Sequence, residues 1–145
     1  MLQDKLTELI EMYAPIDDAQ ERMALIVDSA GRRTQAEPAS LRSEENRVRG
    51  CVSAAWIEGR IDEQGRCMFV CAADSPLVGG LLTTLCGFFS GAMPEEVASS
   101  DLDPLEALGL VRHLSPTRRN GLASARKRIR ELALGFAAGP RSGPS

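Results

Sequence analysis

The four cysteines, Cys51, Cys67, Cys71 and Cys86, are the side chains of this sequence with the clearest chemical potential. A thiolate can serve as a nucleophile or as a metal ligand. The gap between Cys67 and Cys71 is one residue longer than the spacing of a zinc knuckle, so it gives a metal site no support. Phe69 lies between these two residues and Cys86 falls in an apolar stretch. We therefore interpret Cys67, Cys71 and Cys86 as thiols of the core.

Cys51 follows a glycine and a polar segment, Glu44-Glu45-Asn46-Arg47-Val48-Arg49. Gly50 allows a close backbone approach or a positive φ angle. Arg47 and Arg49 are close enough in sequence to favour the thiolate form of Cys51. A reactive thiol and a buried thiol at the start of a strand fit this local sequence equally well.

Other catalytic signals are scarce. The sequence contains one histidine, His113, and no P-loop, GxGxxG or HExxH motif. A Ser-His-Asp triad is an alternative, but no serine lies in a Gly-x-Ser-x-Gly elbow. His113 precedes Ser115-Pro116, so a packing or capping role at a helix entry explains it at least as well as catalysis.

Composition and charge narrow the function classes. The chain has 145 residues, 43% hydrophobic and 26% charged, which is typical of one globular domain. The net charge is −3, which argues against nucleic-acid binding. Residues 112–145 nevertheless carry eight basic side chains and one acid. An acidic protein partner could bind such a segment, but we favour a solvated helix face, formed by Arg126, Lys127, Arg128 and Arg130.

The start of the chain and its hydropathy indicate the compartment. Met1-Leu2-Gln3-Asp4-Lys5 brings charge early, without the apolar core of a signal peptide. No apolar run approaches the roughly 20 residues of a membrane span. We therefore expect a cytoplasmic protein without membrane contact, in which the cysteines remain thiols.

The first half of the chain predicts helices followed by strands. Apolar spacing indicates a helix over residues 2–13 and a second one, capped by Asp17 or Asp18, through about Arg33. A polar loop over 34–46 leads to strands at Val52–Arg60 and Arg66–Ala73, joined by a hairpin over 61–65. Because side chains alternate along a strand, Cys67, Phe69 and Cys71 should share one face. Two strands alone are marginal, so we expect a third strand within residues 41–50.

The second half predicts helices only. Ser75-Pro76 should cap a buried helix over Leu77–Phe89, weakened locally by Gly79-Gly80. Short helices should begin at Pro94 and at Asp103-Pro104, and Ser115-Pro116 should lead to a last helix over about Gly121–Leu134. Grouped strands and grouped helices predict an α+β fold with a small antiparallel sheet packed against helices. We expect one domain over 1–134 and a flexible tail over 135–145.

Three blocks in register resemble the SufE family of cysteine desulfuration proteins. The first is Asn46-x-Val48-x-Gly50-Cys51-x-Ser53-x-x-Trp56, and the second is Ala73-Asp74-Ser75 with Val78 and Gly80-Leu81. The third is His113-Leu114-Ser115-Pro116-x-Arg118-x-x-Gly121-Leu122. The match covers about residues 2–134. The sequence departs from the family pattern at Val52, Ala54 and Ala55, where polar residues are common, and at Gly79, where a basic residue is usual.

The resemblance implies an α+β fold related to the IscU-type scaffold and a function in iron–sulfur cluster assembly. It implies that Cys51 accepts persulfide sulfur from a PLP-dependent cysteine desulfurase and passes it to an assembly complex, without a cofactor or metal of its own. It also implies supporting roles for Gly50, Ser53, Asp74, His113 and Arg118. Arg118 could pair with Asp74, anchor the loop or face the partner. The alternatives are an IscU-like iron–sulfur scaffold or zinc protein, and a non-catalytic regulator of the desulfurase.

Overall fold

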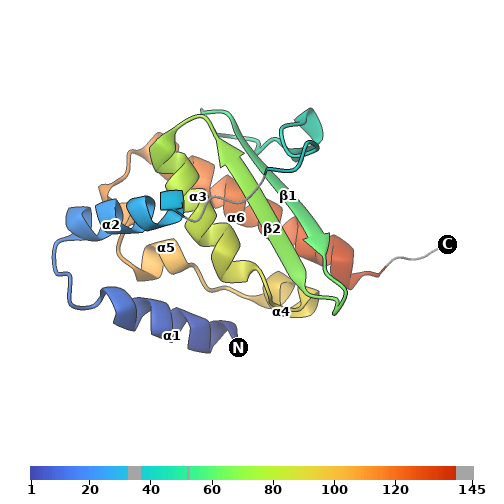
Figure 1. Ribbon diagram of the computed structural model, residues 1–145, viewed down its shortest axis with the longest axis horizontal. Helices are drawn as coiled ribbons and strands as arrows, with labels where there is room; N and C mark the ends of the chain where they lie inside the picture. Colours follow the sequence, from blue (N-terminus) through green and yellow to red (C-terminus); the bar gives the residue numbers. More distant parts are fainter. Residues whose placement is uncertain (33–36, 52, 140–145) are drawn as a thin grey trace.

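The computed structural model describes residues 1–32, 37–51 and 53–139, and it places a β-hairpin among helices (Figure 1). The helices α1 and α2 come first and the hairpin of β1 and β2 follows. The remaining helices α3 to α6 complete the chain. Their bounds are α1 Leu2–Tyr13, α2 Ala19–Arg32, β1 Ala55–Ile61, β2 Cys67–Ala73, α3 Pro76–Phe89, α4 Pro94–Ser99, α5 Pro104–Ala107 and α6 Pro116–Ala137. This arrangement confirms the predicted α+β class.

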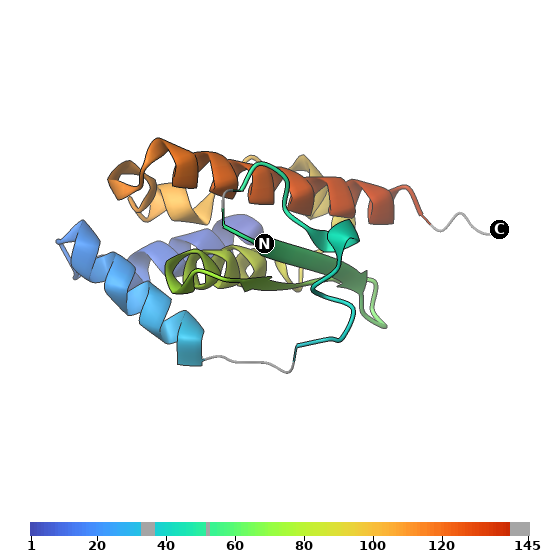
Figure 2. The same ribbon diagram turned by 90° about the horizontal axis from the view of Figure 1, so that it is seen from above.

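One face of the hairpin forms the centre of the core. The antiparallel register pairs Gly59 with Phe69 and Ile57 with Cys71. Cys67, Phe69 and Cys71 share this face, as predicted. It packs against two helices, because Cys71 contacts Thr83 of α3 and Gly59 lies against Leu132 of α6. Figure 2 shows the hairpin with α6 along one side.

The expected third strand is absent from the described residues. Between residues 37 and 51 the only pairing to the sheet is a single bridge from Arg47 to Trp56. The 3-10 turn Glu44–Asn46 interrupts this segment, and the side-chain amide of Asn46 donates to the carbonyls of Ser40 and Leu41. These bonds fold the segment back on itself, so it cannot extend along β1. Helix packing stabilises the two-stranded sheet instead.

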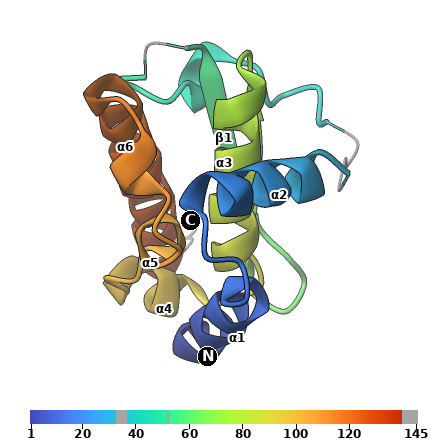
Figure 3. The same cartoon turned by 90° about the vertical axis from the view of Figure 1, so that its left-hand side faces the viewer.

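The helix α3 is the most buried helix of the core. The Oγ atom of Ser75 caps it by accepting from the N–H of Val78 at 3.4 Å, as the sequence predicts. A Cβ atom on Gly80 would lie 2.8 Å from Val27 of α2. Gly80 therefore permits the close crossing of α2 over α3 that Figure 3 shows. The helix α2 is itself capped by Asp18, which accepts from the N–H of Gln20.

The last helix begins earlier than predicted. The helix α6 starts at Pro116, and the hydroxyl of Ser115 accepts from the N–H of Arg118, so this cap replaces the expected start near Gly121. The helix continues to Ala137, three residues past the end of the predicted domain. Residues 140–145 of the predicted tail, like residues 33–36 around the predicted end of α2, lie outside the described residues. In the described part of the chain no helix is long and apolar enough to cross a membrane.

Candidate functional site: a half-buried thiol at an apolar cavity

Cys51 lies on a short loop between Val48 and Ala54, the Cys51 loop. Backbone hydrogen bonds at the ends of the strands hold the two ends of this loop. The N–H of Val48 donates to the carbonyl of Ala55 at 2.9 Å, and the Val48 side chain is only 2% exposed. Beyond the loop, the N–H of Asp74 donates to the carbonyl of Ala54 at 3.0 Å. These contacts anchor both ends of the loop to buried structure. Cys51 is therefore presented at a defined place while its neighbours Arg49 and Gly50 stay exposed.

The loop lies directly against α6 because glycines stand at the contacts. Gly50 has a φ angle of +83°, a region that L side chains rarely adopt, and a Cβ atom there would lie 2.9 Å from Oγ of Ser124. A Cβ atom on Gly121 of α6 would lie 3.1 Å from Sγ of Cys51. The structure thus confirms both expected uses of Gly50, and it assigns a matching role to Gly121.

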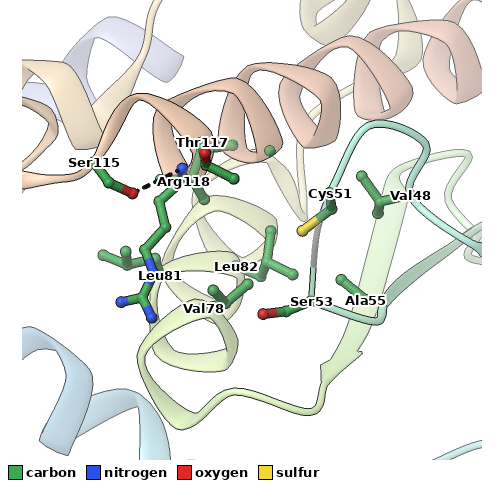
Figure 4. Close-up of a pocket in the computed structure, with 12 residues that line it drawn as sticks. Val48, Cys51, Ser53, Ala55, Val78, Leu81, Leu82, Ser115, Thr117 and Arg118 are labelled. Carbon is green, nitrogen blue, oxygen red and sulfur yellow. Dashed lines mark hydrogen bonds between the residues drawn. The ribbon is translucent and has the colours of Figure 1, made fainter.

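The sulfur of Cys51 faces a cavity of about 150 Å³ between the loop, α3 and α6 (Figure 4). Most of its lining is apolar, and Ser53, Ser115, Thr117 and Arg118 supply polar groups. The lining residues are Val48, Cys51, Ser53, Ala55, Val78, Leu81, Leu82, Ser115, Thr117, Arg118, Gly121 and Leu122. Cys51 and Ser53 both point into this space, and Cys51 is half-buried. A thiol in this position is sheltered on one side and within reach of solvent on the other.

The charges near Cys51 differ from those expected. Arg49 is 77% exposed and pairs with Glu44 at 3.0 Å, while Arg47 lies over the ring of Trp56. Neither of these arginines is among the residues that line the cavity. The cationic side chain of the lining is Arg118, which comes from α6 and stands across the cavity from Cys51 (Figure 4). Arg47 and Arg49 are thus held by Trp56 and Glu44, and their effect on the Cys51 thiol stays a prediction.

Asp74 and His113 lie outside the residues that line the cavity. The exposed carboxylate of Asp74 is 3.6 Å from Arg42, so its ion-pair partner is Arg42 and not Arg118. Arg42 in turn stacks on Trp56, with 4.9 Å between guanidinium and ring centre. His113 ends the exposed 3-10 turn Val111–His113, where its N–H contacts the carbonyl of Leu110. Of the six site residues named from the sequence, Cys51, Ser53 and Arg118 line the cavity, and Gly50 shapes the loop.

The other three cysteines belong to the core, as predicted. Cys67 is fully buried, and loss of hydration, with smaller effects of Glu95 and Asp62, raises the pKa of its thiol to about 11. Cys86 is buried beside Cys71, and the hydrogen bond between the two thiols raises the pKa of Cys86. Among residues 1–32, 37–51 and 53–139, no three His, Cys, Asp or Glu side chains gather in a group that could hold a metal ion.

Three arginines of α6 have roles that the sequence interpretation missed. The sequence predicts Arg126, Arg128 and Arg130 on a solvated face, yet all three are partly buried and donate to backbone carbonyls. Lys127 between them is exposed, as predicted. Arg128 also donates to the side chain of the buried Asn46, 82 positions earlier in the chain. Spacing along a helix indicates which residues share a face, but only the packed structure shows what that face meets.

The fold and the site together define a small α+β protein that presents one half-buried cysteine on a loop beside an apolar cavity. Comparison with known proteins identifies its family. The family model SufE, described as an Fe-S metabolism associated domain, matches residues 7–133. The chain belongs to the SufE family, and its role therefore lies in iron–sulfur metabolism.

Relatives of similar length support this assignment. A SufE-like protein of Rhizobium meliloti (strain 1021) is 31% identical over 134 residues, which span 90% of this chain and 95% of the relative. A SufE-like protein of Rhizobium etli is 32% identical, with 88% of both chains covered. The solution structure of a hypothetical protein from Thermus thermophilus superposes with a TM-score of 0.74 over 93% of this chain and 97% of its own. At 18% identity, this last likeness shows the shared fold alone.

Proposed function

We propose that this protein is a sulfur acceptor that takes persulfide sulfur from a PLP-dependent cysteine desulfurase onto Cys51. It stimulates the desulfurase and passes the sulfur to an iron–sulfur cluster assembly complex. The pyridoxal phosphate belongs to the desulfurase, and the protein works as its sulfur-carrying partner, in the cytoplasm. The observation that carries the proposal is the Cys51 thiol at the mouth of the cavity, within a chain that matches the SufE family over residues 7–133.

The proposed transfer is a thiol exchange and involves no net oxidation. The Cys51 thiolate attacks the outer sulfur of the donor persulfide, and a new S–S bond forms as the donor's S–S bond breaks. The donor cysteine leaves as a thiolate, and Cys51 carries the persulfide. The reaction needs one accessible nucleophile, which the exposed side of the Cys51 loop supplies. A second cysteine or a metal is not required.

The half-buried position of Cys51 also suits the protection of a bound persulfide. A bound persulfide must be protected from stray thiols and oxidants between the two transfers. The apolar lining from α3, including Val78, Leu81 and Leu82, gives the terminal sulfur a dry environment. Arg118 and Ser115 stand at the polar part of the lining. The same loop can therefore shelter the sulfur in one position and offer it to a partner in another.

The test is sulfur loading measured by mass spectrometry. The protein is incubated with a cysteine desulfurase and L-cysteine, and intact mass is expected to show one added sulfur that peptide mapping places on Cys51. The rate of L-cysteine consumption is expected to rise when the protein is present, and Cys51→Ser should abolish both effects. Stimulation that survives Cys51→Ser would identify a non-catalytic regulator, and sulfur found on Cys71 would reject Cys51 as the acceptor.

A further inference from the structure

The segment that leads to Cys51 lies along one stripe of α6. Cys51 contacts Gly121, Gly50 lies against Ser124, and the side chain of Asn46 accepts from Arg128. Residues 121, 124 and 128 are spaced by three and four positions, so they follow one face of the helix. The loop and the helix therefore run side by side in a fixed register, in which Asn46 opposite Arg128 sets Cys51 opposite Gly121.

Arg128 holds two parts of the loop's base at once. Its Nε atom donates to the carbonyl of Ile57 in β1 at 2.9 Å, and its Nη2 atom donates to Oδ1 of Asn46 at 3.1 Å. The amide nitrogen of Asn46 donates in turn to the carbonyls of Ser40 and Leu41, at 3.0 and 3.2 Å. One guanidinium thus joins α6 to the sheet and to the loop across 71 and 82 positions of sequence.

The surroundings make this contact sensitive to substitution. Asn46 is only 8% exposed, so its polar atoms have little access to water. Burial lowers the pKa of the Arg128 guanidinium, an effect that Glu131 and Glu45 oppose. A buried polar group left without its partner is costly, because it gave up its hydration to form the bond. Loss of either side chain leaves the polar group of the other unpaired, and it would therefore favour a position of the loop away from α6, where water reaches that group.

We propose that Arg128, through Asn46, is the positioning residue that keeps the Cys51 loop docked on α6 with its sulfur over Gly121 and the cavity. The importance of this position for sulfur transfer rests on the proposed function, whereas the docking itself does not. Releasing the contact moves Cys51 out of its shelter without any partner. A desulfurase that bound the released loop more tightly than the docked one would draw on the same equilibrium.

The chain offers a matched control for this proposal in Arg126. Arg126 lies on the same helix, is also partly buried and donates to two backbone carbonyls, those of Leu102 and Ser100. These carbonyls belong to the segment between α4 and α5, away from the Cys51 loop. Arg126→Met thus removes bonds of the same kind and leaves the loop contacts in place. Any effect common to both variants reports general loosening of α6.

The experiment measures iodoacetamide labelling of each cysteine in the free protein by peptide mass spectrometry, with the thermal midpoint recorded for every variant. Arg128→Met is expected to speed labelling of Cys51 by about tenfold, the ratio expected for losing one hydrogen bond to a charged group. Asn46→Ala is expected to have a similar effect and serves if Arg128→Met does not fold. The double variant should fall well short of the combined effect of the two single ones, because the Arg128–Asn46 contact is lost in both. Labelling of Cys67, Cys71 and Cys86 should not change.

An unchanged Cys51 rate in Arg128→Met and Asn46→Ala would overturn the proposal, and so would an equal rise in Arg126→Met. Additive rates in the double variant would also overturn it, because the two residues would then act separately. Sulfur loading of the wild-type protein is measured in parallel with a desulfurase and L-cysteine. Absence of loading on Cys51 with the labelling pattern intact would reject the proposed function and leave the docking contact established.

Discussion

The substitution Gly121→Ala tests directly whether the Cys51 loop can move away from α6. The added Cβ atom would lie 3.1 Å from Sγ of Cys51 and 3.6 Å from its Cα atom. The sulfur contact is about 0.4 Å shorter than the 3.5–4.0 Å at which non-bonded heavy atoms attract. The neighbouring segment is exposed at Arg49 and Gly50, whereas α6 is buried at Gly121 itself and along one face that follows it. We therefore expect the loop to move and the helix to stay.

Two opposing free energies decide the outcome for stability. Alanine in place of glycine within a helix stabilises by about 0.8–1.0 kcal/mol. Overpacking in a rigid site costs about 1–3 kcal/mol. If the loop moves away, the gain in helix stability from alanine exceeds the cost of overpacking. The thermal midpoint should then stay constant or rise by about 3 °C. In the same variant Cys51 should react several-fold faster with iodoacetamide, because its sulfur has left the surface of α6.

Gly135→Ala is the control for this prediction. Gly135 lies in the same helix, and a Cβ atom there would meet nothing within 4 Å. Its substitution should leave the Cys51 labelling rate unchanged. The reasoning is refuted if Gly121→Ala is stable with an unchanged labelling rate. A loss of about 2 kcal/mol of unfolding free energy at an unchanged rate would show a rigid loop.

Further outcomes concern the thiols themselves. Cys51→Ser should abolish sulfur loading, whereas Cys67→Ser, Cys71→Ala and Cys86→Ala should keep it, and quantitative mass spectrometry of each variant decides this. Cys51 of the free protein should label slowly and faster with a bound desulfurase; fast labelling that the partner does not alter would contradict the shelter. Because burial raises the Cys67 pKa from 9.0 to about 11, the unfolded chain loses this proton first as the pH rises. Stability should then fall between about pH 9 and 11, and urea unfolding of Cys67→Ala should show a smaller decline; equal declines would reject this assignment.

Local sequence signals were sufficient for most of the elements. Apolar spacing predicts α1 over the same residues that the structure shows, Leu2–Tyr13. Alternation along β2 predicts the shared face of Cys67, Phe69 and Cys71. Ser75-Pro76 marks the start of α3 because a side-chain cap and a proline act within one turn. Each of these signals depends on residues that are close together in the sequence, so it can be recognised without knowledge of the tertiary structure.

The errors occur where a distant segment decides the structure. The expected strand within residues 41–50 is folded back by Asn46, whose bonds to Ser40, Leu41 and Arg128 only the packed chain provides. The predicted start of α6 near Gly121 is the exception, because the Ser115 cap that begins the helix at Pro116 is a local signal of the same kind as Ser75-Pro76 at α3.

The candidate site shows the same difference between local signals and contacts with distant segments. The motif around Cys51 predicts which of the four thiols is functional, and the residue type of Gly50 indicates its unusual backbone. The surroundings of the sulfur come from Gly121, Leu82 and Arg118, which lie 31 or more positions away in the chain. Arg47 and Arg49, the nearest cations in sequence, contact Trp56 and Glu44, which only the folded chain places beside them. Reactivity depends on neighbours in space, and those neighbours are set by how the loop packs between α3 and α6.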